Sequence, residues 1–127
     1  MNPIGKKRIL VVDDEAHIRR LVRGMLGEDY IVLEASDGRE AVDMARMQRP
    51  DLILMDIMMP EMDGYTSLNR ITTHPVTKAI PVVMLTGVGF ELNVKLSQEL
   101  GAEGYITKPF TSQDLKNTIG EFLKSPV

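Results

Sequence analysis

Residues 51–64 read DLILMDIMMPEMDG, and this stretch decides the fold. Leu52 to Met55 form an unbroken apolar run that is too short for a helix, and a loop marked by proline and glycine follows. The pattern predicts a fully buried parallel strand that ends at Asp56. Because ligands of open α/β sheets bind outside the carboxyl ends of the strands, Asp56 is a candidate functional group. The alternative is a turn aspartate that binds only local amides.

The remaining chain alternates between strand-like and helix-like patterns. Apolar, mostly β-branched runs predict strands at residues 8–12, 30–33, 82–85 and 104–107. Five helices are predicted between and after the strands, and the third is a short helix at 65–72. The other four have these apolar residues on their buried faces, in chain order: Ile18, Leu21, Val22, Met25 and Leu26; Ala41, Val42 and Ala45; Leu92, Leu96 and Leu100; and Leu115, Ile119, Phe122 and Leu123. Five alternating pairs imply an α/β fold, with a doubly wound parallel sheet and helices on both faces.

Several helix ends are marked in the sequence. The spacing of a capping box begins helices at residues 37–40 and 111–114. His74-Pro75 closes the short third helix, because the residue before proline disfavours the helical region. Gly101 stops the fourth helix.

Composition excludes several classes of protein. The chain has 127 residues, 43% of them hydrophobic and 26% charged, which is ordinary for one globular domain over residues 1–127. No apolar run approaches the roughly 20 residues of a membrane span, and the run behind the basic start stops at Asp13, too soon for a signal peptide. We therefore expect a cytoplasmic protein, and the absence of cysteines agrees with that placement. A net charge of −3 gives no electrostatic case for direct nucleic-acid binding.

Polar residues follow four of the five predicted strands. Asp13 and Asp14 follow the first strand, Asp56 the third, Thr86 the fourth and Lys108 the fifth. The carboxyl ends of parallel strands share one edge of the sheet, so all five side chains are expected there. Three carboxylates drawn together repel unless a cation joins them, and an all-oxygen set suits Mg²⁺.

These residue types support phosphoryl chemistry. A carboxylate can attack phosphorus to give an aspartyl phosphate, and Asp56 is the best-placed nucleophile. Lys108 would offset charge on the phosphoryl oxygens, and the hydroxyl of Thr86 could donate to one of them.

The sequence resembles the receiver domain of bacterial two-component response regulators over residues 7–124, and in particular the single-domain chemotaxis regulators. The resemblance rests on VVDDE at 11–15, the stretch 51–64, LTG at 85–87 and YITKPF at 105–110. It implies a flavodoxin-like sheet of strand order 2-1-3-4-5. The chain ends directly after its last helix, so we expect either a stand-alone domain or a piece of a longer regulator.

The resemblance implies a role for each site residue. Asp56 accepts a phosphoryl group from a phosphohistidine of a sensor kinase or phosphotransfer protein. Asp13, Asp14 and Asp56 hold Mg²⁺ together with the backbone carbonyl of Met58. Thr86, Gly87 and Lys108 bind the phosphoryl group.

The resemblance also implies a switch and a cis bond between Lys108 and Pro109. Thr86 swings towards the phosphoryl group and Tyr105 turns inward. The surface of helix four, strand five and helix five then changes for an unknown target. A monomer or a phosphorylation-dependent dimer is expected, and the domain is not expected to be a dedicated enzyme.

Other functions remain open. A receiver-like scaffold could bind partners without phosphorylation. A phosphatase of the haloacid dehalogenase type also uses an aspartyl nucleophile, but it needs a second aspartate where this chain has Met58. A flavodoxin-like nucleotide binder needs a Gly, Ser or Thr loop in place of residues 13–15.

Smaller features have competing interpretations. Asp14 is expected partly to cap the first helix, and Tyr105 could be an ordinary half-buried aromatic residue. Arg19, Arg20 and Arg23 form a basic face that is either solvated or docks an acidic kinase surface. Two hypotheses concern the loops: residues 87–90 are mobile before phosphorylation, and dephosphorylation is slow because the side chains at 58 and 88 cannot position water.

Overall fold

The computed structural model describes residues 5–57, 64–87 and 91–123. Its elements are, in chain order, β1 (Lys7–Val12), α1 (Ala16–Leu26), the short 3₁₀ helix η2 (Gly27–Asp29), β2 (Tyr30–Ala35), α2 (Gly38–Gln48), β3 (Leu52–Asp56), α3 (Gly64–Thr73), β4 (Val82–Thr86), α4 (Glu91–Glu99), β5 (Gly104–Thr107) and α5 (Ser112–Phe122).

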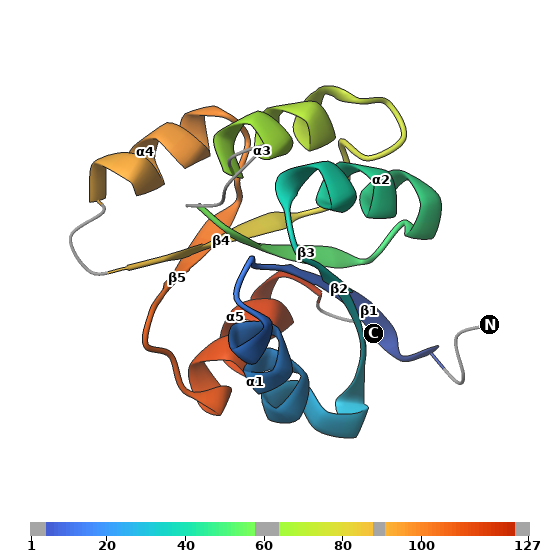
Figure 1. Cartoon of the computed structure of the whole chain (residues 1–127), viewed down its shortest axis with the longest axis vertical. Helices are drawn as coiled ribbons and strands as arrows, with labels where there is room; N and C mark the ends of the chain where they lie inside the picture. Colours follow the sequence, from blue (N-terminus) through green and yellow to red (C-terminus); the bar gives the residue numbers. More distant parts are fainter. Residues whose placement is uncertain (1–4, 58–63, 88–90, 124–127) are drawn as a thin grey trace.

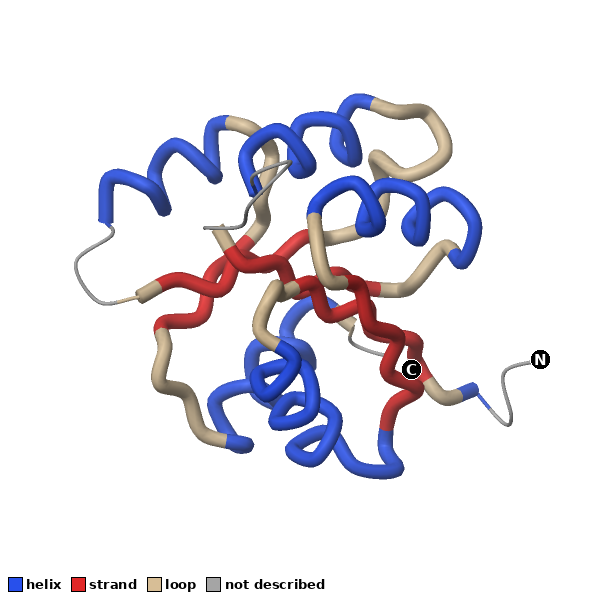
Figure 2. Tube along the Cα trace, in the orientation of Figure 1, coloured by secondary structure: helices blue, strands red, loops and turns tan. Residues whose placement is uncertain are grey.

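The strands form one parallel sheet in the order β2-β1-β3-β4-β5, as the resemblance implied. Figure 1 shows α2, α3 and α4 on one face of this sheet and α1 and α5 on the other. The tube in Figure 2 shows the same layers, with the strands between two groups of helices. The doubly wound α/β prediction is therefore confirmed.

The sheet separates two apolar cores. Leu10, Val12, Ile53 and Met55 point to the core beneath α2 and α3. Their neighbours in sequence, Ile9, Val11, Leu52 and Leu54, point to the core beneath α1 and α5. Because successive side chains of a strand alternate between faces, a strand covered on both sides must be apolar at every position. This explains the unbroken run at 52–55.

Three local predictions need correction. Leu21 of α1 and Leu96 of α4 were placed on buried faces, but their exposed fractions are 47% and 43%. Leu21 lies at the edge of the apolar stripe of α1. In α4 the buried position is Ser97, which is 1% exposed, so the helix is turned with Leu96 beside its buried side rather than on it. Strand β2 also extends two residues beyond the predicted 30–33, because Glu34 and Ala35 pair with the last two residues of β1.

The helix caps largely follow the sequence. Thr111 and Asp114 form the complete capping box at the start of α5. Asp37 caps α2 by accepting from the Glu40 amide at 2.8 Å. The Glu40 carboxylate, however, accepts from the amide of Ser36 at 3.2 Å, one residue before the expected position.

Within the described parts of the chain, no helix combines the length and the apolar character that crossing a membrane requires.

Candidate functional site

The carboxyl ends of four strands bring the predicted residues to one edge of the sheet. Asp13 directly follows β1, and its amide donates to the carbonyl of Ala35 at 3.1 Å. Asp56 is the last residue of β3, and Thr86 is the last residue of β4. The amide of Lys108 donates to the carbonyl of Thr86 at 2.6 Å, which continues the β4–β5 pairing beyond the strands.

The ammonium group of Lys108 lies between two carboxylates. Its Nζ atom is 3.1 Å from Oδ2 of Asp13 and 3.6 Å from Oδ2 of Asp56. Burial by itself lowers the pKa of Lys108, but the charges of Asp56 and Asp13 outweigh burial, so the pKa is raised. Lys108 therefore stays protonated and joins residues that are far apart in the sequence.

The acidic residues after β1 have different environments. Asp13 is fully buried, and its Oδ1 accepts from the amide of Glu15 at 2.9 Å. Asp14 and Glu15 are exposed. One carboxylate oxygen from each of Asp13, Asp14 and Glu15 lies within 4.8 Å of the others. The predicted capping by Asp14 is wrong, because the N-cap of α1 is Glu15, which makes no side-chain capping bond.

This donor set fits a hard divalent cation. All the groups are carboxylate oxygens, which Mg²⁺ prefers, and the exposed pair leaves room for the waters that Mg²⁺ retains. Glu15 was not predicted to belong to the group, although its place next to Asp14 was the available signal. The predicted carbonyl ligand, Met58, lies outside the described residues.

The two predicted switch residues differ in exposure. Thr86 is buried, and its hydroxyl is 3.3 Å from the carbonyl oxygen of Gly87. Tyr105 on β5 is 50% exposed. The predicted cis bond between Lys108 and Pro109 is confirmed. The loop hypotheses concern residues 58 and 87–90; of these, 58 and 88–90 lie outside the described ranges, and both hypotheses stay predictions.

Gly64 is a site residue that the sequence marked only as part of a loop. Its amide donates to the carbonyl of Ile57 at 3.1 Å, so α3 begins against the end of β3. A Cβ atom at Gly64 would lie 2.6 Å from the carbonyl oxygen of Asp56 and 2.7 Å from that of Ile57. The backbone that carries Asp56 thus approaches α3 too closely for any side chain at this position.

The family model described as response regulator receiver domain matches residues 9–120. The chain belongs to the response regulator receiver family. It is 38% identical over 118 residues to the chemotaxis protein CheY of Halobacterium salinarum, covering 92% of this chain and 97% of that protein. It is 38% identical over 119 residues to the alkaline phosphatase synthesis transcriptional regulatory protein PhoP of Bacillus subtilis, covering 93% of this chain and 49% of that protein. The receiver chain thus spans about half the length of the transcriptional regulators that it matches.

Solved receiver structures have the same fold. Chemotaxis protein CheY4 of Vibrio cholerae matches with a TM-score of 0.87 at 32% identity, covering 94% of this chain and 100% of that one. The receiver domain of sensor histidine kinase PA1611 from Pseudomonas aeruginosa matches with a TM-score of 0.87 at 29% identity, covering 95% of this chain and 100% of that one. That structure has a magnesium ion coordinated in its active site cleft. The resemblance to receiver domains inferred from the sequence is confirmed. Receiver domains are signalling switches of two-component systems.

Proposed function

We propose that this receiver domain is a phosphorylation-dependent switch in which Asp56 is the phosphoacceptor. The phosphoryl group comes from a phosphohistidine of a sensor histidine kinase or phosphotransfer protein. The observation that carries the proposal is the position of Lys108 Nζ, 3.1 Å from Asp13 and 3.6 Å from Asp56. A cation held beside a carboxylate at a strand end stabilises an anionic group that arrives there.

The transfer is a displacement at phosphorus. A carboxylate oxygen of Asp56 attacks phosphorus, the bond from phosphorus to the histidine nitrogen breaks, and the nitrogen keeps the electron pair. Lys108 then interacts with the phosphoryl oxygens. Thr86 and Gly87 border the same strand end, and the Thr86 hydroxyl can give up its 3.3 Å contact with the Gly87 carbonyl to donate to phosphate.

Magnesium is the cofactor that we infer for this site. Asp13, Asp14 and Asp56 would hold it, as the family resemblance implies. Within the described residues, the carboxylates that lie within 4.8 Å of one another are those of Asp13, Asp14 and Glu15, and this group does not include Asp56. When bound, Mg²⁺ neutralises charge on the phosphoryl oxygens. The carboxylate donor set and the magnesium ion in the PA1611 receiver support this assignment.

The output of the switch is a changed surface on α4, β5 and α5. The exposed side chain of Tyr105 belongs to this surface, and the buried Thr86 lies on the neighbouring strand. We infer that Thr86 moves towards the phosphoryl group and that Tyr105 turns inward to follow it. The target is a protein whose identity the chain does not encode, and cytoplasmic location remains a prediction from the sequence.

Intact mass after incubation with acetyl phosphate tests the acceptor. The unchanged protein should gain one phosphoryl group with Mg²⁺, and little or none without it. Asp56→Asn should abolish the adduct. Asp51→Asn is the matched control, because Asp51 precedes the same strand at its other end, where it accepts from the Arg8 amide at 2.7 Å. If no adduct forms, the proposal is wrong and the scaffold alternative is favoured. If Asp56→Asn retains the adduct, the proposal is wrong because another residue is the acceptor.

A further inference from the structure

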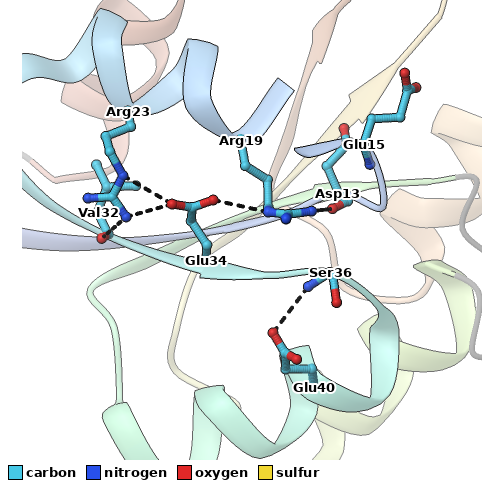
Figure 3. A network of polar contacts seen from close by, with 8 residues as sticks. All are labelled: Asp13, Glu15, Arg19, Arg23, Val32, Glu34, Ser36 and Glu40. Atoms are coloured by element: carbon cyan, nitrogen blue, oxygen red, sulfur yellow. Dashed lines mark hydrogen bonds and ion pairs between the residues drawn. The ribbon is translucent and has the colours of Figure 1, made fainter. Parts of the chain in front are cut away.

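A network of side chains joins α1 to β2 beside the acidic residues 13–15 that follow β1 (Figure 3). Glu34 of β2 accepts from Arg19 Nε at 3.0 Å through Oε1. Through Oε2 it accepts from Arg23 Nε at 3.0 Å and from Arg23 Nη2 at 2.7 Å. The sequence had suggested a basic face of Arg19, Arg20 and Arg23 that was solvated or open to a kinase. Two of these three side chains instead bind within the domain.

Arg19 and Arg23 differ in their second partner. Nη1 of Arg19 donates to the carbonyl oxygen of Asp13 at 2.6 Å, whereas Nη2 of Arg23 donates to the carbonyl oxygen of Val32 at 3.1 Å. A guanidinium group holds its donors in a fixed plane, so the bond from Arg19 to Glu34 also sets the direction of Nη1. The side chain of Arg19 is only 17% exposed, which limits competition from water.

The carbonyl of Asp13 completes the fixation of this residue. The amide of Asp13 donates to Ala35, Oδ1 accepts from the Glu15 amide, and Oδ2 accepts from Lys108. With Arg19 on the carbonyl, every polar group of Asp13 has a partner within the protein. Because the peptide unit is planar, a fixed carbonyl also fixes the start of Asp14.

We propose that Arg19 is a positioning residue for the Mg²⁺ site, an inference that rests on the proposed function. Glu34 orients Arg19, and Arg19 holds the Asp13 carbonyl, which sets the relative placement of the carboxylates of Asp13 and Asp14. Replacing a group that orients metal ligands in this way commonly lowers metal affinity on the order of ten- to a hundredfold.

Two substitutions that conserve charge separate positioning from packing. In Arg19→Lys, the single ammonium pairs with the Glu34 carboxylate, the stronger acceptor, and the Asp13 carbonyl loses its donor. Arg23→Lys is the matched control, because Arg23 also pairs with the Glu34 carboxylate but makes no bond to Asp13. Magnesium titrations of the unphosphorylated full chain, followed by amide chemical shifts, should give a Kd on the order of tenfold higher for Arg19→Lys. The Kd should be unchanged for Arg23→Lys.

The unchanged protein supplies a second readout that does not depend on a variant being folded. Binding effects are reciprocal, so Mg²⁺ should shift the Nε–H resonance of Arg19 more than that of Arg23. Equal shifts of the two resonances, or an unchanged Kd in folded Arg19→Lys, would show that Arg19 only packs α1 on the sheet. This inference would then be wrong, and the proposed function would still stand. If the unchanged protein binds no Mg²⁺ at all, the proposed cofactor and this inference both fail.

Discussion

At the scale of single residues, Glu34 shows how a partly exposed ion-pair network links stability to pH. Hydrogen bonding from Arg23 lowers the pKa of Glu34, burial opposes this, and Arg19 adds to the lowering. A carboxyl whose pKa is lower in the folded state stabilises that state above its unfolded pKa. This contribution is lost as pH falls through the folded pKa.

Replacing Glu34 should therefore have an effect that depends on pH. Glu34→Gln should lower the free energy of unfolding by about 1 kcal/mol or less at pH 7, because solvent screens a pair that is partly exposed. The difference in free energy of unfolding between the variant and the unchanged protein should shrink as pH falls below 4.5, the ordinary pKa of a glutamate. Urea unfolding between pH 7 and pH 3 measures it, with the exposed Glu121→Gln as control. A difference that stayed constant with pH would contradict the assignment.

Residue type and strand position together predicted much of the site. Asp13, Asp56, Thr86 and Lys108 each follow or end an apolar run, and the geometry of parallel strands brings such positions together. Arg19 and Gly64 could not be found in this way. The role of Arg19 depends on a carbonyl partner, and that of Gly64 on the approach of two backbones, neither of which leaves a mark in a sequence pattern.

At the scale of elements, the junction between β3 and α3 fixes the backbone of Asp56, the proposed acceptor. Gly64→Ala would place a Cβ atom within 3.0 Å of three backbone atoms of Asp56 and Ile57. Backbone cannot yield as a flexible side chain does, so we expect a loss of about 1–3 kcal/mol in the free energy of unfolding. We also expect shifted resonances for Asp56.

Gly24 in α1 is the matched control for this substitution. A Cβ atom there meets nothing within 4 Å, and alanine is the better helix former. Gly24→Ala should raise the free energy of unfolding by about 0.5–1 kcal/mol. Denaturant unfolding of both variants decides the matter. Equal effects of the two substitutions would show that helix propensity, rather than the close approach at β3, controls stability at Gly64.

The boundaries of a strand could be predicted from the sequence where the strand is buried along its whole length. Strands β3 and β4 are buried at every position, so their apolar runs gave their boundaries to within a residue. Strand β2 lies at the sheet edge, and its polar Glu34 ended the predicted run early because the arginine partners on α1 were not foreseen. The exposure of Leu21 and Leu96 likewise depends on how far each helix covers the sheet, which helical periodicity does not specify.

At the scale of the whole molecule, the candidate site and the proposed output surface share the strands β4 and β5. Thr86 ends β4 beside the acceptor edge, and Tyr105 lies on β5, paired in register with Met84 of β4. In the proposed switch, the hydroxyl of Thr86 moves towards the phosphoryl group, and the side chain of Tyr105 exchanges its exposed position for a buried one.

Tyrosine fluorescence can test this coupling directly. The chain has three tyrosines and no tryptophan, and Tyr105 is exposed whereas Tyr30 and Tyr65 are partly buried. Acrylamide quenching should therefore fall when the protein is phosphorylated with acetyl phosphate and Mg²⁺. Tyr105→Phe should remove most of the change, and Asp56→Asn should show none. Unchanged quenching in a sample that intact mass shows to be phosphorylated would mean that Tyr105 stays outside. The signal would then have to reach the α4, β5 and α5 surface through helix movement alone.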